Sequence, residues 1–510
     1  MSTQAEMTNS NSRRRLLVAH PLGIDTQQEA VVFMHQDCGV CRSEGFTAHA
    51  RVKVTNGSSW IIATLYRVSS DLVRPNQVGL SNSAWARLAL EEGDLASVTH
   101  PEPVESLRAV RAKIYGHRIE APAMRGIISD IVAGRYSDND LAAFITACAS
   151  APLDRNETIA LTRAMVDTGD RLKWGGSCVL DKHSVGGLPG NRTTPIVVSI
   201  VAACGLTMPK TSSRAITSPA GTADAMETLA PVNLSLAKMR QVVEREGGCI
   251  VWGGAVSLSP ADDILIGIER ALDIDSEGQL IASVLSKKIA AGSTHLVLDM
   301  PVGPTAKVRS SEAAGALSDT LQDVAAEFGL TTRVVIGDGT QPVGRGIGPA
   351  LEAHDVLAVL QGKHDAPLDL KNRALGLATA ILDMSGKFRP HTGAKVAAKV
   401  LADGRAWEKF QRICEAQGGM RVPSVALHRK EVTSPAKGIV QKVDLRRLAK
   451  VAKLAGAPED KAAGAVMQVR LGDLVERDQP LFTLHAESPG ELDYALDYAR
   501  ANADIIVVGN

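Results

Sequence analysis

Aromatic residues and net charge are both scarce in this chain of 510 residues. Phe, Trp and Tyr make up only 3% of it, too few to suggest platforms on which nucleic-acid bases would stack. Lys and Arg number 56, as do Asp and Glu, so the formal net charge is +0. This balance argues against a nucleic acid polymer or an anionic membrane as the main partner. Apolar runs of transmembrane length are also missing.

Cysteine is sparse too, and the seven cysteines are scattered along the chain. We therefore expect reduced thiols and a cytoplasmic location. Residues 1–15 are polar and then basic, which predicts a disordered tail. Cys38 and Cys41 form one C-x-x-C pair with His35 and His49 nearby, but a zinc site usually needs two such close pairs. We favour a structural role for these residues and expect no metal site.

The pattern of apolar and polar residues changes several times along the chain, as expected for more than one domain. Alternating, β-rich residues predict a small N-terminal domain at 16–102. Helical periodicity predicts a helical lobe at 104–175. Strands and helices then alternate through 176–433, which predicts a mostly parallel sheet covered by helices. Short strands with one helix at 434–510 predict a small α+β closing domain. The expected fold class is α/β, with a helical lobe and β-rich terminal domains.

The most informative stretch is residues 181–191, which read DKHSVGGLPGN. A β-branched run precedes it and an apolar segment follows, so the pattern predicts a strand, a glycine-rich loop and a helix. Backbone N–H groups at such a helix N-terminus favour an anion. Lys182 would add a full charge, and Ser184, Thr193 and Thr194 would add hydroxyl donors. Phosphate binding is the expected chemistry; a solvated turn is the alternative.

A second loop rich in hydroxyl groups follows the predicted strand 208–212. If the two strands are neighbours, both loops open at one edge of the sheet. Ser212 and Thr222 could then join Lys182 around one phosphate. Arg214 could bind the ligand or could pair with nearby carboxylates, and the sequence leaves both roles open.

A third stretch precedes the apolar helix predicted at 280–291. Ser276 fits the N-cap of that helix, which leaves Asp275 just outside it as a candidate acid. Ser283 and Lys287 are four residues apart and share one helix face, so they could bind a ligand together. Helix capping and a solvated lysine face are the alternative.

Several of these motifs resemble the thymidine and pyrimidine-nucleoside phosphorylase family. Residues 212–216 (SSRAI) with 221–227 (GTADAME) are close to its signature, and residues 182–187 look like its phosphate loop. Residues 282–288 (ASVLSKK) are similar to its substrate helix. The resemblance runs from about residue 104 to the C-terminus. The additional N-terminal domain resembles a longer subfamily that includes archaeal AMP phosphorylases.

The resemblance implies a helical lobe with a returning segment near 262–291, an α/β lobe, and a substrate between them. It also implies a homodimer or higher homo-oligomer that acts on a nucleoside or nucleotide with inorganic phosphate, without a further cofactor. Asp275 would be the proton donor, with His183 near the base and Lys182 as a catalytic cation. The implied phosphate ligands are Lys182, Ser184, Thr193, Thr194, Ser212 and Thr222. The implied nucleoside or nucleotide ligands are Gly187, Ser213, Arg214, Ala215, Ile216, Thr217, Ser218, Ser283, Lys287 and Lys307.

The expected reaction is phosphorolysis of thymidine to thymine and 2-deoxyribose 1-phosphate, in nucleoside salvage. Two departures from the family pattern favour a nucleoside monophosphate instead. Residues 217–219 read TSP where nucleoside phosphorylases have Gly-His-Thr, and Ile268 stands where a base-binding Arg is expected. AMP, CMP or UMP would then give free base and ribose 1,5-bisphosphate.

Two further alternatives lie outside phosphorolysis. One is a non-catalytic nucleotide-binding regulator that kept the fold. The other is chemistry of the related anthranilate phosphoribosyltransferase, for which Asp262 and Asp263 could hold Mg²⁺. The order of residues 182–184 favours phosphorolysis.

Overall fold

The computed structural model describes residues 16–27, 29–188, 190, 192–215, 218–272, 274 and 276–509. The predicted tail at 1–15 lies outside these residues. The chain divides into two compact units, with the boundary between Ala147 and Cys148. Among the described residues, no helix is long and apolar enough to cross a membrane.

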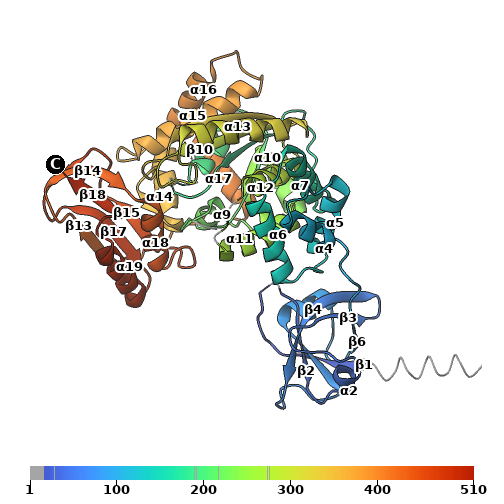
Figure 1. Cartoon of the computed structure of the whole chain (residues 1–510). Helices are drawn as coiled ribbons and strands as arrows, with labels where there is room; N and C mark the ends of the chain where they lie inside the picture. The colour runs from blue at the N-terminus through green and yellow to red at the C-terminus, as the bar shows by residue number, and fades with distance from the viewer. Residues whose placement is uncertain are drawn as a thin grey trace, which may run out of the picture. The chain divides into compact units, whose positions relative to one another are not determined.

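The first unit begins with a closed six-stranded barrel in the order β1-β5-β2-β4-β3-β6. Figure 1 shows these strands curling round a common interior. Apolar side chains alternate along the strands and fill that interior, among them Val32, Val52 and Leu65. The strands are β1 (Leu16–Pro21), β2 (Val31–His35), β3 (Arg51–Asn56), β4 (Ser59–Val68), β5 (Gln77–Leu80) and β6 (Leu95–Thr99), with the short helices α2 (Gly39–Ser43) and α3 (Asn82–Leu88).

Helices follow the barrel: α4 (Leu107–Ile114), α5 (Ala121–Val132), α6 (Asp138–Ser150) and α7 (Arg155–Asp167). The start of α7 is fixed by a capping box, in which the Asp154 carboxylate accepts from the Glu157 amide and Glu157 accepts in return. Helix α12 (Glu277–Ala290) packs along α7. Ile159 thereby contacts the apolar cluster that contains Ile281 and Leu285.

The second unit contains a parallel sheet. Strands β11 (Thr331–Asp338), β10 (His295–Val302) and β7 (Leu180–Ser184) lie side by side. Strands β8 (Met208–Ser212) and β9 (Gly248–Trp252) form a parallel pair, and a parallel bridge from Val179 to Thr207 joins that pair to β7. The other elements of this part are α8 (Thr193–Ala203), α9 (Thr222–Glu227), α10 (Leu236–Glu246), η1 (Gly253–Val256), α11 (Pro260–Leu272), α13 (Ser311–Ala326), β12 (Gly346–Ile347), α14 (Pro349–Leu360), α15 (Leu368–Met384), α16 (Gly393–Ala402) and α17 (Arg405–Gln417).

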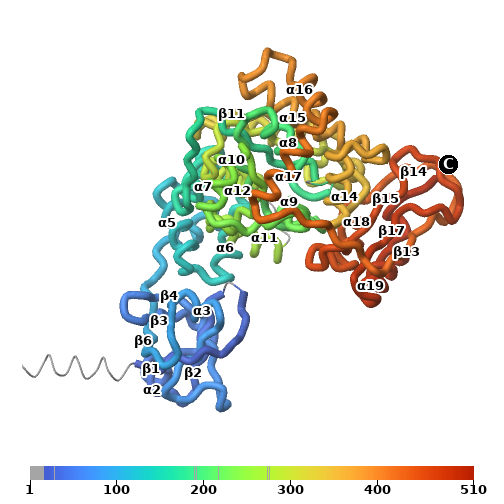
Figure 2. Tube along the Cα trace, turned by 180° about the vertical axis from the view of Figure 1, so that it is seen from behind, coloured from blue at the N-terminus to red at the C-terminus, as the bar shows by residue number. Residues whose placement is uncertain are grey.

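The C-terminal part contains two small sheets, β12-β15-β17-β13 and β16-β14-β18. Its first sheet includes β12, which comes from the preceding lobe. Helix α14 contacts β12 and β15, and Figures 1 and 2 show α14 next to the strands of the C-terminal part. Gly348 and Gly464 make this junction close, because a Cβ on Gly464 would lie 1.9 Å from the Ile347 carbonyl oxygen. The elements are β13 (His428–Thr433), β14 (Gly438–Val443), α18 (Leu445–Leu454), β15 (Gly464–Met467), β16 (Leu474–Val475), β17 (Pro480–Ala486), α19 (Pro489–Ala501) and β18 (Ile506–Gly509).

The predicted fold class is confirmed, with one correction that matters for the site. From the sequence, the first strand of the glycine-rich motif is predicted at 178–181, with residues 182–184 in the loop that follows. In the structure β7 continues to Ser184. The polar run is strand because it pairs in register with residues 297–299 of β10. As a result, successive side chains point to opposite faces of the sheet.

Candidate functional site

The two predicted loops open at the same edge of the sheet. Strands β7 and β8 run parallel and are joined near their beginnings by the Val179–Thr207 bridge and by a hydrogen bond from the Leu180 amide to the Thr207 carbonyl. Their carboxyl ends therefore lie at one edge, which is where open α/β sheets bind ligands. Lys182 and Ser212 belong to these ends.

Lys182 is fully buried, and its ammonium group is surrounded by hydroxyl groups. Its Nζ donates to Ser184 Oγ at 2.5 Å, to Thr193 Oγ1 at 2.8 Å and to Thr194 Oγ1 at 3.3 Å. Strand β7 supplies Ser184, and the first turn of α8 supplies the two threonines. The structure thus brings together four of the six predicted phosphate ligands.

Asp299, within β10, is the acidic member of this cluster. Its Oδ2 accepts from Ser184 Oγ at 3.0 Å and lies 3.8 Å from Lys182 Nζ. Its other oxygen forms an ion pair with Arg373 of α15. Asp299 therefore orients Ser184 while Arg373 holds the carboxylate in place.

Burial lowers the pKa of Lys182 to about 8, and the attraction of Asp299 opposes that shift. A buried ammonium group whose acceptors are neutral hydroxyls is electrostatically unsatisfied. An anion that reached it would gain a charge-assisted contact.

The opposite face of β7 carries Asp181 and His183. Asp181 lies 2.9 Å from Lys288 Nζ and 3.6 Å from Lys210 Nζ, and all three residues are buried. Loss of solvation, followed by the nearby charges of Lys288 and Lys210, lowers the pKa of His183 well below its usual value. The imidazole is therefore neutral at physiological pH, and Lys287 is also close enough to affect it.

The second loop is held by internal contacts. The Asp224 carboxylate accepts from the Ala215 amide at 2.6 Å and the Gly221 amide at 2.9 Å. Arg214 donates to Asp224 at 3.1 Å and to Glu227 at 2.8 Å, which favours the structural role that the sequence left open. A Cβ on Gly221 would lie 2.6 Å from the Ser213 carbonyl oxygen, so only glycine fits there.

The hydroxyl groups of this loop lie beside the same edge. Ser212 is buried at the end of β8 and donates to the Val251 carbonyl at 3.1 Å. Thr222 is buried and is the first residue of α9, directly after Gly221. Ser213 is exposed, and Ser218 donates to the Ala220 carbonyl at 2.9 Å.

The predicted base-binding pair lies on α12. Lys287 Nζ donates to Ser283 Oγ at 3.2 Å and to Asp262 of α11 at 2.5 Å. Asp262 is buried and already paired with this lysine, which weakens the reading of Asp262 as a Mg²⁺ ligand. Lys307 lies beside the glycine-rich loop, since a Cβ on Gly186 would be 3.5 Å from its Cδ, and Gly187 is the next loop residue.

Three predicted site residues, Asp275, Ile216 and Thr217, lie outside the described residues. Cys38 and Cys41 lie in the apolar core of the barrel. Among the residues the structure describes, no group of three or more His, Cys, Asp or Glu side chains could hold a metal ion.

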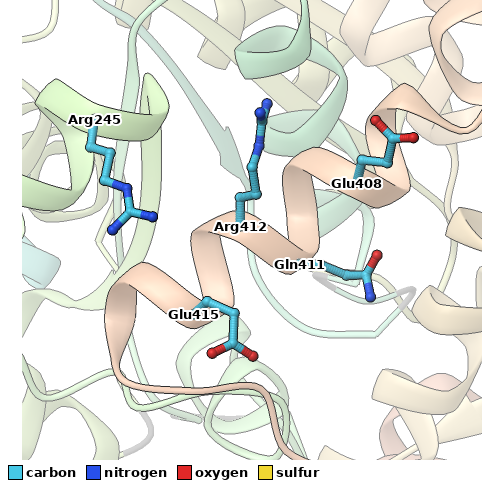
Figure 3. Close-up of a pocket in the computed structure, with 5 residues that line it drawn as sticks. All are labelled: Arg245, Glu408, Gln411, Arg412 and Glu415. Atoms are coloured by element: carbon cyan, nitrogen blue, oxygen red, sulfur yellow. The ribbon is translucent and has the colours of Figure 1, made fainter.

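A surface hollow of about 490 Å³ lies elsewhere in the second unit. Figure 3 shows its lining side chains, one from α10 and four from α17: Arg245, Glu408, Gln411, Arg412 and Glu415. Two carboxylates balance the two guanidinium groups, and Arg412 already faces Glu246 at 3.4 Å. The hollow includes none of the predicted site residues.

Five charged members of the site were not predicted as functional from the sequence, although two of them lie within the quoted stretches 181–191 and 282–288: Asp181, Lys210, Lys288, Asp299 and Arg373. One local signal was present. Asp299 interrupts the apolar strand LVLDM, and an acid in a buried strand is rare unless it is paired.

Three family models match successive parts of the chain. Residues 107–169 match the helical bundle domain of the glycosyl transferase family, residues 176–407 match its a/b domain, and residues 439–506 match the pyrimidine nucleoside phosphorylase C-terminal domain. A solved structure of anthranilate phosphoribosyltransferase from Thermus thermophilus has a TM-score of 0.51 at 21% identity, over 61% of this chain and 99% of that one. That likeness concerns the fold.

Close relatives cover almost the whole chain. Proteins named "Putative thymidine phosphorylase" are 60% identical in Sphingopyxis alaskensis (98% of this chain, 97% of the relative) and 60% identical in Polaromonas (96% and 95%). The relative from Legionella pneumophila is 58% identical over 96% and 94%. The chain belongs to the thymidine and pyrimidine-nucleoside phosphorylase family, and it is a pentosyltransferase of the glycosyl transferase type.

Proposed function

We propose that this enzyme is a pyrimidine nucleoside phosphorylase that converts thymidine and inorganic phosphate into thymine and 2-deoxyribose 1-phosphate. The observation that carries the proposal is the buried ammonium group of Lys182 within its shell of hydroxyls at the sheet edge. The names of the close relatives support the same reaction.

Phosphate would enter the hydroxyl shell and accept from Lys182, whose present acceptors can turn to donate to the anion. The second loop would complete the binding through the hydroxyl groups of Ser212 and Thr222. Held in this way, a phosphate oxygen can attack C1′ in line with the bond to the base. The C1′–O bond forms as the C1′–N bond breaks, and the electron pair leaves with the base.

The departing base carries the electron pair, so its negative charge must be neutralised by a proton or stabilised by nearby positive charge. Lys287 and Ser283 on α12 would contact it, and the nearby neutral His183 would offer a hydrogen bond. We assign the proton to Asp275, which follows α11 and precedes the N-cap of α12. The reaction as proposed uses phosphate as co-substrate and no further cofactor. A homodimer through the helical lobes remains a prediction.

A nucleoside monophosphate is the second candidate substrate. Ile268 on α11 offers no guanidinium to a pyrimidine, while Lys307 beside the phosphate loop adds positive charge. A 5′-phosphate would use that charge, and the product would be ribose 1,5-bisphosphate.

One panel separates the candidates. Thymidine, uridine, AMP, CMP and UMP are each incubated with phosphate, and release of free base is followed. Thymidine as best substrate supports the first proposal, and a monophosphate as best substrate supports the second. Absence of phosphate-dependent release from all five would contradict both.

A further inference from the structure

Arg192 is the largest fully buried side chain among the described residues, and it directly precedes the two threonines that bind Lys182. It is the N-cap residue of α8. Its guanidinium donates to the Gly346 carbonyl and lies 3.3 Å from Glu352 and 3.5 Å from Asp355 of α14. The first turn of α8 is therefore fastened to the segment 341–346 and to α14.

Segment 341–346 is itself fixed by carboxylates. Asp355 Oδ2 accepts from the Arg345 amide at 2.7 Å and the Gly346 amide at 2.8 Å. Asp369 of α15 accepts from the Gly344 amide at 2.8 Å. Charge-assisted bonds to backbone amides give this glycine-rich segment a defined path.

The C-terminal domain holds the same segment from the other side. Arg470 donates to the Pro342 carbonyl at 3.0 Å and the Gly344 carbonyl at 3.1 Å, and it pairs with Asp369. The Leu471 amide donates to Gln341 at 3.0 Å. One guanidinium group thus bridges two carbonyls and a carboxylate, which a lysine could not reproduce.

We propose that Arg470 and Arg192 are positioning residues through which the C-terminal domain fixes the start of α8, and with it Thr193 and Thr194, against Lys182. Neither arginine binds the substrate in this scheme. The inference rests on the proposed function, because it assigns these hydroxyls to phosphate.

A small displacement of the α8 start would move both threonine hydroxyls away from the phosphate position. Misplacement of about 1 Å can cost about a hundredfold in rate. The base-binding pair Ser283 and Lys287 lies on α12, which takes no part in these contacts. Loss of the Arg470 and Arg192 contacts should therefore weaken the binding of phosphate more than the binding of the nucleoside.

Arg470→Gln is the informative variant, because Arg470 is partly exposed and its loss leaves no fully buried charge. We expect the KM for phosphate to rise at least about tenfold, with a change below about twofold in the KM for the nucleoside. Arg470→Lys should restore only part of the loss. Arg192→Lys should act in the same direction, and the double variant should be non-additive. Arg447→Gln, which removes an exposed ion pair with Asp504 in the same domain, is the matched control.

A second readout does not depend on turnover. Phosphate should raise the Tm of the unaltered enzyme through binding, and Arg470→Gln should lose most of that increase. Two results would contradict the positioning role of Arg470. One is an equal change in both KM values, and the other is a phosphate-dependent Tm increase that Arg470→Gln leaves intact. If the unaltered enzyme shows neither phosphate-dependent base release nor a phosphate-dependent Tm, the proposed function itself fails.

Discussion

The two faces of β7 bury lysines in different ways. On one face Lys182 contacts three neutral hydroxyls, with the nearest carboxylate oxygen 3.8 Å away. On the other face Lys288 lies 2.9 Å from Asp181. A paired buried lysine contributes to the architecture, whereas one without a close counter-charge is free to attract an anion. We therefore interpret the Lys288–Asp181 contact as a structural ion pair, and we propose that the Lys182 face of the same strand is the binding site.

Removing the cation from the first face should have the largest effect on activity. Lys182→Ala should lower turnover at least about a hundredfold, equivalent to about 2.7 kcal/mol of barrier. Initial rates of base release measure this effect. Lys437→Ala, at an exposed ion pair, is the control. Near-normal activity of Lys182→Ala would exclude Lys182 from the mechanism.

Breaking the ion pair on the second face should lower the stability of the fold more than it lowers the activity. Asp181→Asn leaves Lys288 and Lys210 buried without their carboxylate, and such a change costs about 3–5 kcal/mol of folding free energy. Thermal unfolding should show a Tm lower by several degrees. If Asp181→Asn keeps its Tm but loses turnover, the two faces do not differ as described.

The pH dependence sharpens the comparison. In the proposed mechanism Lys182 binds phosphate in its protonated form, and burial lowers its pKa to about 8. Below that pH the charge is present; as the pH rises through about 8 it is lost, and the KM for phosphate should rise about tenfold per pH unit. Measurements of KM from about pH 6.5 to about pH 9.5 test this. A constant KM across that range would exclude Lys182 as the titrating ligand.

Asp299 should produce the smallest effect. Its attraction opposes the lowering of the Lys182 pKa. Asp299→Asn should therefore shift the rise in KM for phosphate to lower pH. Asp338→Asn, at the exposed end of β11, is the matched control. If the KM for phosphate rises at the same pH as in the unaltered enzyme, or at a higher pH, Asp299 does not influence the Lys182 pKa as described.

The sequence predicted what depends on local pattern. The strand predicted at 208–212 is β8, and parallel order predicted that the two loops share an edge. The end of β7 was misplaced, because a run of polar residues reads as loop unless its neighbour strand is known. Arg373 and Arg470 could not be foreseen, since each acts on a residue at least 70 positions away, and no local pattern encodes such pairs.

The close junction between β12 and β15 has a practical consequence for anyone shortening this protein. A chain that stops before residue 428 would leave Gly346 and Ile347 without the strand they pair with. An open strand edge of this kind invites association with other chains. The final eighty or so residues are better regarded as part of the catalytic body than as an accessory that can be cut away.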